Sequence, residues 1–454
     1  MRGKSKEASA ATPAPSLDGA ASWYTVGVLM FAYMVAFIDR QIITLLIEPI
    51  KQTFDVNDTQ VSLLSGFAFA LFYTVLGLPI ARLADRTNRK RLIAVGAFLW
   101  SLMTAAAGLA STFWILLLTR IGVGIGEATI TPAALSMIAD SFSRKRVARA
   151  VSVYAVGLYI GAGLAVLAGS VIIRLSSGIE TFDLPLVGAT KPWQMTFFVV
   201  GALGVPLLLL LQTLKEPQRQ NLVSEENGTP VPDAQIPYSE VMKFVGHHKR
   251  LLCAHFLGFG ICFGLVITAY MTWVPELLRR NYSLDIADAG TIFGIILIFF
   301  GSAGPISASY LTSWLRDRGY EDAEMRVSVW AGFFMIPFVI LAPLVGNLYL
   351  TIALLCGAIF FLSVPQGMAP AILQIVAPNR MRAQLTALFM LVGVLAAYTL
   401  GPSLVAVLTD YYFRDDASLK YSLALVCGVI TPLGVLSLSL GLKHYRAALQ
   451  SSDQ

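Results

Sequence analysis

Long apolar stretches alternate with short polar ones along almost the whole chain. Windows of about 19 residues, the length that crosses a bilayer as a helix, fit this pattern twelve times. The predicted spans cover approximately residues 22–48, 59–83, 91–111, 112–140, 148–176, 191–214, 250–280, 285–313, 323–345, 347–377, 382–409 and 419–445. Backbone groups in lipid must satisfy one another, so the pattern predicts an all-α bundle of membrane-spanning helices.

The two halves of the chain resemble each other. Pro132–Ala139 in the fourth predicted span is similar to Pro370–Ala377 in the tenth, and both precede basic loops. This repetition predicts two pseudo-symmetric halves of six helices each. The expected organisation is a tail at 1–21, a first half at 22–214, a linker at 215–249 with a short amphipathic helix, a second half at 250–445 and a tail at 446–454.

Composition supports a membrane protein and sets its expected orientation. Hydrophobic residues make up 56% of the chain and charged residues 13%, and the mean hydropathy is +0.70. With both termini inside, 24 of the 33 Lys and Arg residues fall on the inner side, as the positive-inside rule requires. The net charge of +6 therefore indicates topology rather than nucleic-acid binding. We expect a multi-pass protein of the bacterial inner membrane with both termini cytoplasmic.

Four charged residues interrupt the apolar spans of the first half. Asp39 and Arg40 lie in the first span, and Arg120 and Glu127 lie in the fourth. Each such charge costs roughly 2.5–3.5 kcal/mol at the centre of a membrane helix, so we expect these side chains to face a polar cavity. The corresponding positions of the second half carry no charge, which makes this a site of the first half alone.

Helix geometry places two of these charges at one depth. At about 1.5 Å per residue, Asp39 and Arg120 both lie roughly 12–14 Å below the outer surface and can pair. Glu127 returns to nearly the same helix face about 10 Å deeper, near the level of Tyr33. The spacing predicts a two-level arrangement for a proton or a charged headgroup. For Arg40 two orientations stay open, one toward this site and one toward the interface or backbone.

Several motifs resemble the major facilitator superfamily, and within it the Spinster-like transporters. Ala81–Arg91 resembles the superfamily's loop between its second and third helices. Arg120 is followed by Gly122, Gly124 and Gly126, as in the family's fourth helix. Ile38-Asp39-Arg40 and Gly126-Glu127-Ala128 point to the Spinster subfamily. The resemblance implies a transporter working by alternating access, and Spinster relatives move sphingosine phosphates and lysophospholipids.

We interpret the site as a proton-coupled one. Asp39 is the expected proton carrier, Arg120 its switchable partner, and Glu127 a second protonation or substrate site, because a partner's charge controls a buried carboxyl. The alternative is a static ion pair that fixes the two helices. The expected substrate cavity combines both halves, and its residues are Tyr33, Arg40, Arg120, Glu127, Gln366 and Tyr398.

Two further groups have expected roles. By the resemblance, inner-loop residues act as a cytoplasmic gate, and the candidates are Asp85, Arg86, Arg89 and Arg144. Small residues in the fifth span let helices approach closely, and these are Gly157, Gly161 and Gly163. His255 and the four cysteines are expected to pack in the apolar interior, and no metal-ligand spacing occurs.

The predicted function is proton-coupled secondary transport of an amphiphilic or lipid-like solute. A proton-independent facilitator, a carrier for efflux of drugs or organic solutes, and a lipid-binding membrane protein without transport remain open. The chain has no Walker A loop, no H-E-x-x-H and no G-x-S-x-G, so we expect no ATPase, protease or hydrolase activity. The expected partners are the lipid bilayer, the solute and protons, without nucleic acid or a cofactor, and we expect a monomer.

Overall fold

The fold described here is that of a computed structural model. It covers residues 18–142, 144–175, 178–179, 181–184, 188–217, 238–378 and 381–452. Within these residues, twelve helices are long and apolar enough to cross a membrane, which confirms the number of predicted spans. The elements form two bundles that correspond to the two halves of the chain.

The first bundle contains six spans, and four of them consist of two consecutive helical segments. Its elements are α1 (Ala20–Ile42) with η1 (Ile43–Leu45), α2 (Ile47–Phe54), α3 (Asp58–Ser65) with α4 (Phe67–Arg86), α5 (Arg89–Ala107), α6 (Phe113–Glu127) with α7 (Ile130–Ser141), α8 (Arg144–Leu175), the strands β1 (Phe182–Leu184) and β2 (Gly188–Thr190), and α9 (Pro192–Ala202) with α10 (Gly204–Thr213).

The second bundle begins with the short helix α11 (Tyr238–His247), which matches the amphipathic helix expected in the linker. Its spans are α12 (Lys249–His255) with η2 (Phe256–Phe263) and α13 (Gly264–Tyr282), α14 (Ile286–Ile296) with η3 (Leu297–Gly301) and α15 (Ser302–Arg316), α16 (Ala323–Leu344), α17 (Leu348–Val376), α18 (Arg382–Val407) with η4 (Leu408–Phe413), and, after η5 (Asp416–Ser418), α19 (Leu419–Ser452). The segments η2, η3 and η4 are π-helical.

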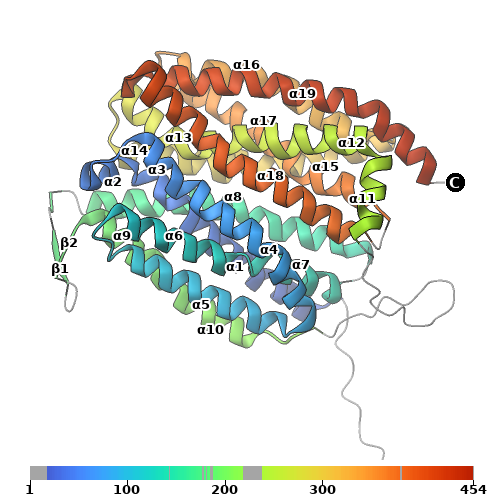
Figure 1. Cartoon of the computed structure of the whole chain (residues 1–454), viewed down its shortest axis with the longest axis horizontal. Helices are drawn as coiled ribbons and strands as arrows, with labels where there is room; N and C mark the ends of the chain where they lie inside the picture. Colours follow the sequence, from blue (N-terminus) through green and yellow to red (C-terminus); the bar gives the residue numbers. More distant parts are fainter. Residues whose placement is uncertain are drawn as a thin grey trace, which may run out of the picture.

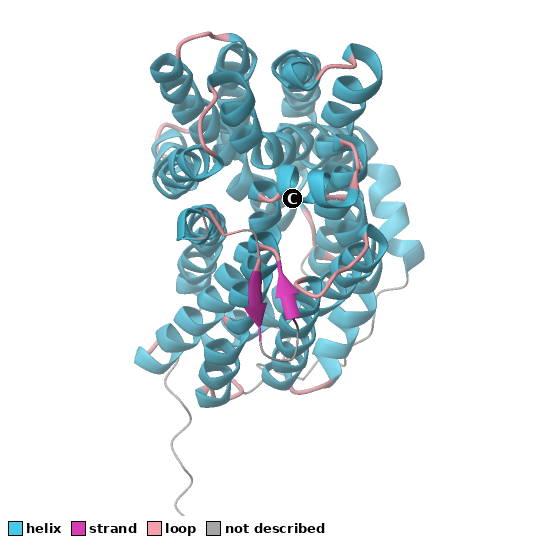
Figure 2. Ribbon diagram, turned by 90° about the vertical axis from the view of Figure 1, so that its left-hand side faces the viewer, coloured by secondary structure: helices cyan, strands magenta, loops and turns pink. Residues whose placement is uncertain are grey.

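The two bundles lie side by side with their helices roughly parallel (Figure 1). Between them, α8 packs against α14, and α3 and α4 pack against α18. One end of the molecule carries α11 and the C-terminus, and we call it the linker face. The other end carries α2, α3 and the hairpin of β1 and β2, which stands out from the helices in Figure 2, and we call it the hairpin face.

Local sequence explains where the elements at the hairpin face begin. The first span ends at Leu45, slightly earlier than predicted, and the chain then forms the separate helix α2. Asn57 starts α3 with a reciprocal cap, because its side chain accepts from the Gln60 amide and Gln60 accepts from the Asn57 amide. These caps fix the polar start of α3 at the boundary between the two bundles.

The glycines of α8 lie at close helix contacts. A Cβ atom on Gly161 would lie 2.6 Å from the Met34 carbonyl oxygen of α1, and one on Gly157 would lie 3.1 Å from the Met30 carbonyl oxygen. A Cβ atom on Gly163 would lie 2.7 Å from the Gly294 carbonyl oxygen in the other bundle. The three glycines therefore let α8 approach both α1 and α14.

Candidate functional site

Asp39 forms a buried ion pair with Arg120. Arg120 Nη1 donates to Asp39 Oδ1 at 2.6 Å, and Nη2 donates to the Asp39 carbonyl oxygen at 3.3 Å. The other carboxylate oxygen of Asp39 accepts from the Thr104 hydroxyl of α5. All three side chains are buried, so this pair lies inside the first bundle rather than in an open cavity, contrary to the sequence-based expectation.

Arg40 forms a second ion pair between the same two helices. Its Nε donates to Glu127 Oε2 at 2.5 Å, and Glu127 is fully buried. The guanidinium carbon also lies 4.7 Å, 4.4 Å and 4.8 Å from the ring centres of Phe37, Phe69 and Tyr73. Aromatic faces attract a cation at such distances, so Arg40 is held by both a carboxylate and an aromatic box.

Each ion pair retains an unused polar atom that faces the site. Within the described residues, Glu127 Oε1 and Arg120 Nε are buried without a hydrogen-bond partner. Asp39 and Arg120 also lie near enough to Glu127 to interact with it electrostatically. Leaving a buried polar atom without a hydrogen bond costs free energy. Here one unused atom belongs to a carboxylate and the other to the guanidinium of the neighbouring ion pair.

A small cavity of about 30 Å³ lies beside Arg40 at the boundary of the two bundles. Phe37 and Arg40 line it from α1, and Thr268, Met271 and Tyr398 line it from α13 and α18. A cavity of this volume holds about one water molecule. Among the four intramembrane charges, Arg40 is the one that lines this cavity, while the other three are at most 1% exposed.

The structure brings together most of the predicted site residues. Asp39 pairs with Arg120 as the helix geometry predicts, and Glu127 pairs with Arg40, whose side chain is thus directed toward this site. Tyr33 stacks on Tyr154 at 4.6 Å and contacts Phe37, one turn before Arg40.

The two predicted cavity residues of the second bundle lie at different places, and only one of them is at the cavity beside Arg40. Tyr398 lines the small cavity beside Arg40. Gln366 is exposed on α17, and the described residues give it no hydrogen bond to the ion pairs. Gln366 is therefore not part of the assembled site in this conformation.

Two of the four predicted gate residues, Arg86 and Arg89, form no ion pair with the second bundle among the described residues. Arg89 is buried and binds within the first bundle, to Asp140, to Ser136 and to Glu216, the last at 2.8 Å. Arg86 is exposed at the end of α4. The side chains of Asp85 and Arg144 lie outside the described residues. Arg89 therefore joins the start of α5 to α7 and to the segment that follows α10.

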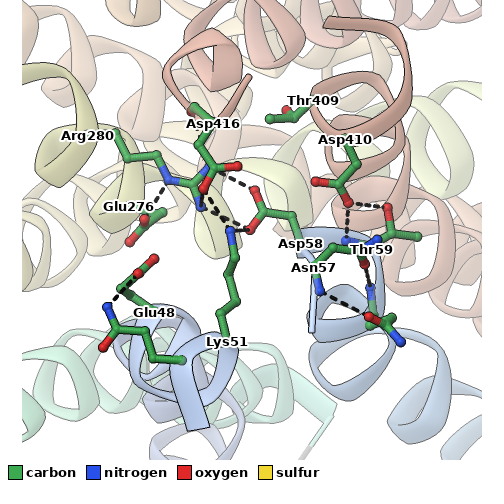
Figure 3. A network of polar contacts seen from close by, with 12 residues as sticks. Glu48, Lys51, Asn57, Asp58, Thr59, Glu276, Arg280, Thr409, Asp410 and Asp416 are labelled. Atoms are coloured by element: carbon green, nitrogen blue, oxygen red, sulfur yellow. Dashed lines mark hydrogen bonds and ion pairs between the residues drawn. The ribbon is translucent and has the colours of Figure 1, made fainter. Parts of the chain in front are cut away.

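A network of charges joins the two bundles at the hairpin face (Figure 3). Arg280 of α13 binds both carboxylate oxygens of Asp58 in α3, at 2.8 Å and 2.9 Å, and its Nε donates to Glu276 at 2.6 Å. Lys51 of α2 lies 2.8 Å from Asp58 and 2.9 Å from Asp416. Arg280, Asp58 and Glu276 are at most 5% exposed, so water competes little with these contacts.

Two further contacts extend this network. Arg279 Nη2 donates to Glu48 at 3.0 Å, and Asp410 accepts from both the amide and the hydroxyl of Thr59, at 2.7 Å and 2.6 Å. Burial by itself lowers the pKa of Lys51, but hydrogen bonds to Asp58 and Asp416 outweigh that effect and hold the pKa above its usual value. Lys51 thus stays charged, and the hairpin face is closed by ion pairs.

Sequence reasoning missed this network, although it carried a signal. Glu48, Lys51 and Asp58 follow the first span, and Glu276, Arg279 and Arg280 end the seventh, which is the equivalent span of the second half. Pseudo-symmetry places the ends of these two spans at the same face, near the boundary of the bundles. Opposite charges at equivalent ends could therefore have predicted a contact.

His255 has the packing role expected for it. The side chain is fully buried, and its ring lies 4.9 Å from Phe259 and 5.0 Å from Phe389. Neither ring nitrogen has a hydrogen-bond partner among the described residues. It is separate from the two ion pairs.

Comparison with known proteins identifies the relatives of this chain. Residues 29–438 match the family profile of the Major Facilitator Superfamily. A probable L-galactonate transporter of Escherichia coli is 25% identical over 418 residues, which cover 90% of this chain and 86% of that protein. An MFS-type efflux pump of Mycolicibacterium smegmatis is 26% identical over 442 residues, which cover 94% of each.

A solved structure has the same fold. The crystal structure of a bacterial homologue of the human lysosomal transporter Spinster, in an inward-facing and unoccupied conformation, superposes with a TM-score of 0.72. It is 24% identical in sequence, and the superposition covers 95% of this chain and 98% of that one.

Proposed function

The chain belongs to the Major Facilitator Superfamily, and from this premise we propose that it couples the movement of an amphiphilic solute to protons. Members of this superfamily are membrane transporters, and the twelve spans in two halves suit alternating access of a central site to the two faces. The pair of adjacent ion pairs between α1 and α6 is the observation that carries the proposal.

The proposed coupling begins with protonation of Asp39. A proton on Asp39 removes the negative charge that holds Arg120, which leaves a buried cation without its partner. Glu127 interacts electrostatically with Arg120 and has an unused carboxylate oxygen, so it can become the new acceptor. As Glu127 turns toward Arg120, Arg40 is released toward the cavity that it lines. Protonation of Asp39 thus frees the Arg40 guanidinium, which can then bind solute.

The released Arg40 supports an anionic headgroup as the part of the solute that is recognised. A guanidinium offers several donors to a phosphate or carboxylate, and the rings of Phe37 and Phe69 add an apolar surface beside it. Met271 and Tyr398 face the same cavity from the second bundle. A lysophospholipid combines such a headgroup with an apolar tail, and the fold similarity to a Spinster homologue favours this class.

A hydrophilic or drug-like organic solute is the second candidate. It is favoured by two relatives that each cover most of this chain, a probable L-galactonate transporter and an efflux pump. A galactonate-like acid would use the same guanidinium but would not need the apolar walls. The two candidates therefore differ in whether an acyl tail is required for transport.

We also propose an orientation and an oligomeric state. The basic loops favour a bacterial inner-membrane protein with the linker face, and hence both termini, in the cytoplasm. Each chain carries a complete pair of bundles with its own central site, so we propose a monomer as the working unit.

Transport in proteoliposomes tests this function. We would measure uptake of a fluorescent lysophospholipid driven by a pH gradient, for the wild type, Asp39→Asn and Glu127→Gln. Glu321→Gln, an exposed acid in a loop, is the control. We expect gradient-driven uptake in the wild type and the control, and its loss in both site variants. Uptake of galactonate but not lysophospholipid would favour the second candidate, and uptake unaffected by the gradient would contradict proton coupling.

A further inference from the structure

A second candidate binding site lies on the linker face, remote from the ion pairs between α1 and α6. There the junction of α11 and α12 and the last turns of α19 surround a cavity of about 450 Å³. Five of its lining residues are basic, and they are His247, His248, Lys249, Arg250 and His444. We call this cavity the histidine pocket.

Among the described residues, no acidic side chain balances the charge of the histidine pocket. None of its lining residues is acidic. Lys249 and Arg250 are exposed, and no described residue forms an ion pair with them. Other arginines at this end of the second bundle differ in this respect, because Arg446 binds Asp322 and Arg316 binds Glu324. The pocket is thus a concentration of positive charge that an anion from outside can neutralise.

Both walls of the pocket are held by packing. Val241 of α11 is buried with Leu252, Leu373 and Leu385, so α11 is fixed against the ends of three spans. The centre of the His248 ring lies 4.3 Å from that of the Phe244 ring, and the two planes are tilted by 30°. On the other side, α12 and α19 are joined by a hydrogen bond of 3.1 Å from Ser437 to the Ala254 carbonyl oxygen. The basic side chains therefore project from a fixed frame.

We propose that the histidine pocket binds a phosphate group. A phosphate accepts several charge-assisted hydrogen bonds at once, which suits lysine, arginine and histidine donors from two sides of one cavity. Leu251, Ala447 and Ala448 give the pocket an apolar floor. Basic pockets between helix ends at the bilayer surface are typical sites for anionic lipid headgroups, and soluble phosphate shares the same chemistry.

The bound phosphate would connect two spans of the second bundle. Lys249 and Arg250 begin the seventh span, whereas His444 belongs to the twelfth, which extends beyond it at the linker face. A phosphate held between Lys249, Arg250 and His444 would link α12 to α19 beside α11. The ligand would thus stabilise the second bundle without entering the transport site.

Native mass spectrometry of the full chain tests the proposal. Protein in detergent is offered phosphatidylglycerol or phosphatidylcholine, and retention of one lipid is compared for the wild type and the double variant Lys249→Gln, Arg250→Gln. The double variant Arg91→Gln, Arg318→Gln is the control, because it removes the same charge from exposed residues of the linker face. His444→Gln tests the opposite wall independently. Inorganic phosphate is added in a parallel series.

We expect the wild type and the control to retain phosphatidylglycerol in preference to phosphatidylcholine. Loss of two charges should lower the affinity roughly 30-fold, and His444→Gln should lower it less. Displacement of the lipid by millimolar inorganic phosphate would support the pocket with soluble phosphate as its ligand, and resistance to it would support the lipid. Equal loss in the control, or equal retention of the two lipids by the wild type, would overturn the proposal.

Discussion

Asp39 and Arg40 are neighbours in the chain, but their side chains lie in different surroundings. A step of about 100° around α1 directs Asp39 toward Arg120 and Thr104 inside the first bundle, and Arg40 toward Glu127 and the small cavity. In the proposed mechanism, Asp39 holds the proton away from the solute, and Arg40 contacts the solute. Coupling between the two needs no long pathway, because α6 supplies both partners.

The Arg40–Glu127 pair gives a prediction about stability. Arg40→Gln leaves Glu127 as a buried acid without its partner, and Glu127→Gln does the same to Arg40, so each single variant should lose about 3–5 kcal/mol of stability. The double variant should recover part of that loss, because neither charge remains. Thermal unfolding in detergent measures these stability changes, for the wild type, both single variants and the double variant.

A matched control for this cycle is the exposed ion pair between Arg174 and Asp288. Both side chains are more than half exposed, so Arg174→Gln should cost at most about 1 kcal/mol. Losses that simply add in the Arg40 and Glu127 double variant would contradict a direct interaction between the two.

Sequence reasoning could predict one of these pairs but not the other. Depth along the helices is readable from the chain, and it places Asp39 and Arg120 at one level. The partner of Arg40 depends on how α1 is rotated about its axis, which α5, α4 and the aromatic rings decide together. The apolar pattern of α1 is too uniform to show that rotation, so the sequence left the orientation of Arg40 open and gave Glu127 no partner.

At the scale of elements, the ends of α3 and α13 determine whether the hairpin face is closed. Asp58 is the centre of the closure, since Arg280 and Lys51 both bind it. Asp58→Asn removes one charge and leaves two buried or half-buried cations facing each other. The closed arrangement should therefore lose free energy relative to one that is open at this face.

Accessibility from the hairpin face measures this effect. A cysteine in place of Thr44, which lines the small cavity, would be labelled by a membrane-impermeant thiol reagent after the four native cysteines are replaced. A shift of about 1.4 kcal/mol toward the open arrangement should raise the labelling rate about tenfold in the Asp58→Asn background. Asp288→Asn, which breaks an exposed pair between the same bundles, should change it little. Equal effects of the two substitutions would contradict the role of Asp58.

The contact of α8 with α1 gives a second prediction at this scale. In Gly161→Ala the new methyl group would lie 2.6 Å from the Met34 carbonyl oxygen, so the helices must separate. We expect a loss of about 1–3 kcal/mol in stability, measured by thermal unfolding. Gly27→Ala on α1 meets nothing within 4 Å and should be neutral or slightly stabilising. Similar melting temperatures for the two variants would contradict close packing at Gly161.

Among the elements, the twelve spans were predictable, whereas their internal irregularities were not. An apolar run such as Phe256–Phe263 has the same composition whether it is α-helical or π-helical, and the structure shows the π form. The backbone path of this segment depends on how closely it approaches other spans, because Gly260 lies against Gly393 and Gly258 lies against Leu438. The hairpin of β1 and β2 was also missed, because its strands are only three residues long.

At the scale of the whole molecule, charge is arranged in three layers. Paired charges close the hairpin face, two ion pairs lie within the first bundle, and unpaired basic residues gather at the linker face. Closure at one face together with a central site is the arrangement that alternating access requires. Opening the hairpin face should therefore depend on events at Asp39 and Arg40, which lie on the same α1 that leads toward α2.

Proton movement driven by solute tests the central claim most directly. Proteoliposomes containing a pH-sensitive dye would receive a lysophospholipid gradient without any imposed pH gradient, with wild type and Asp39→Asn in parallel. We predict a change of internal pH in the wild type, and solute exchange without a pH change in Asp39→Asn. An equal pH change in Asp39→Asn, or solute movement by the wild type without a pH change, would contradict coupling through Asp39.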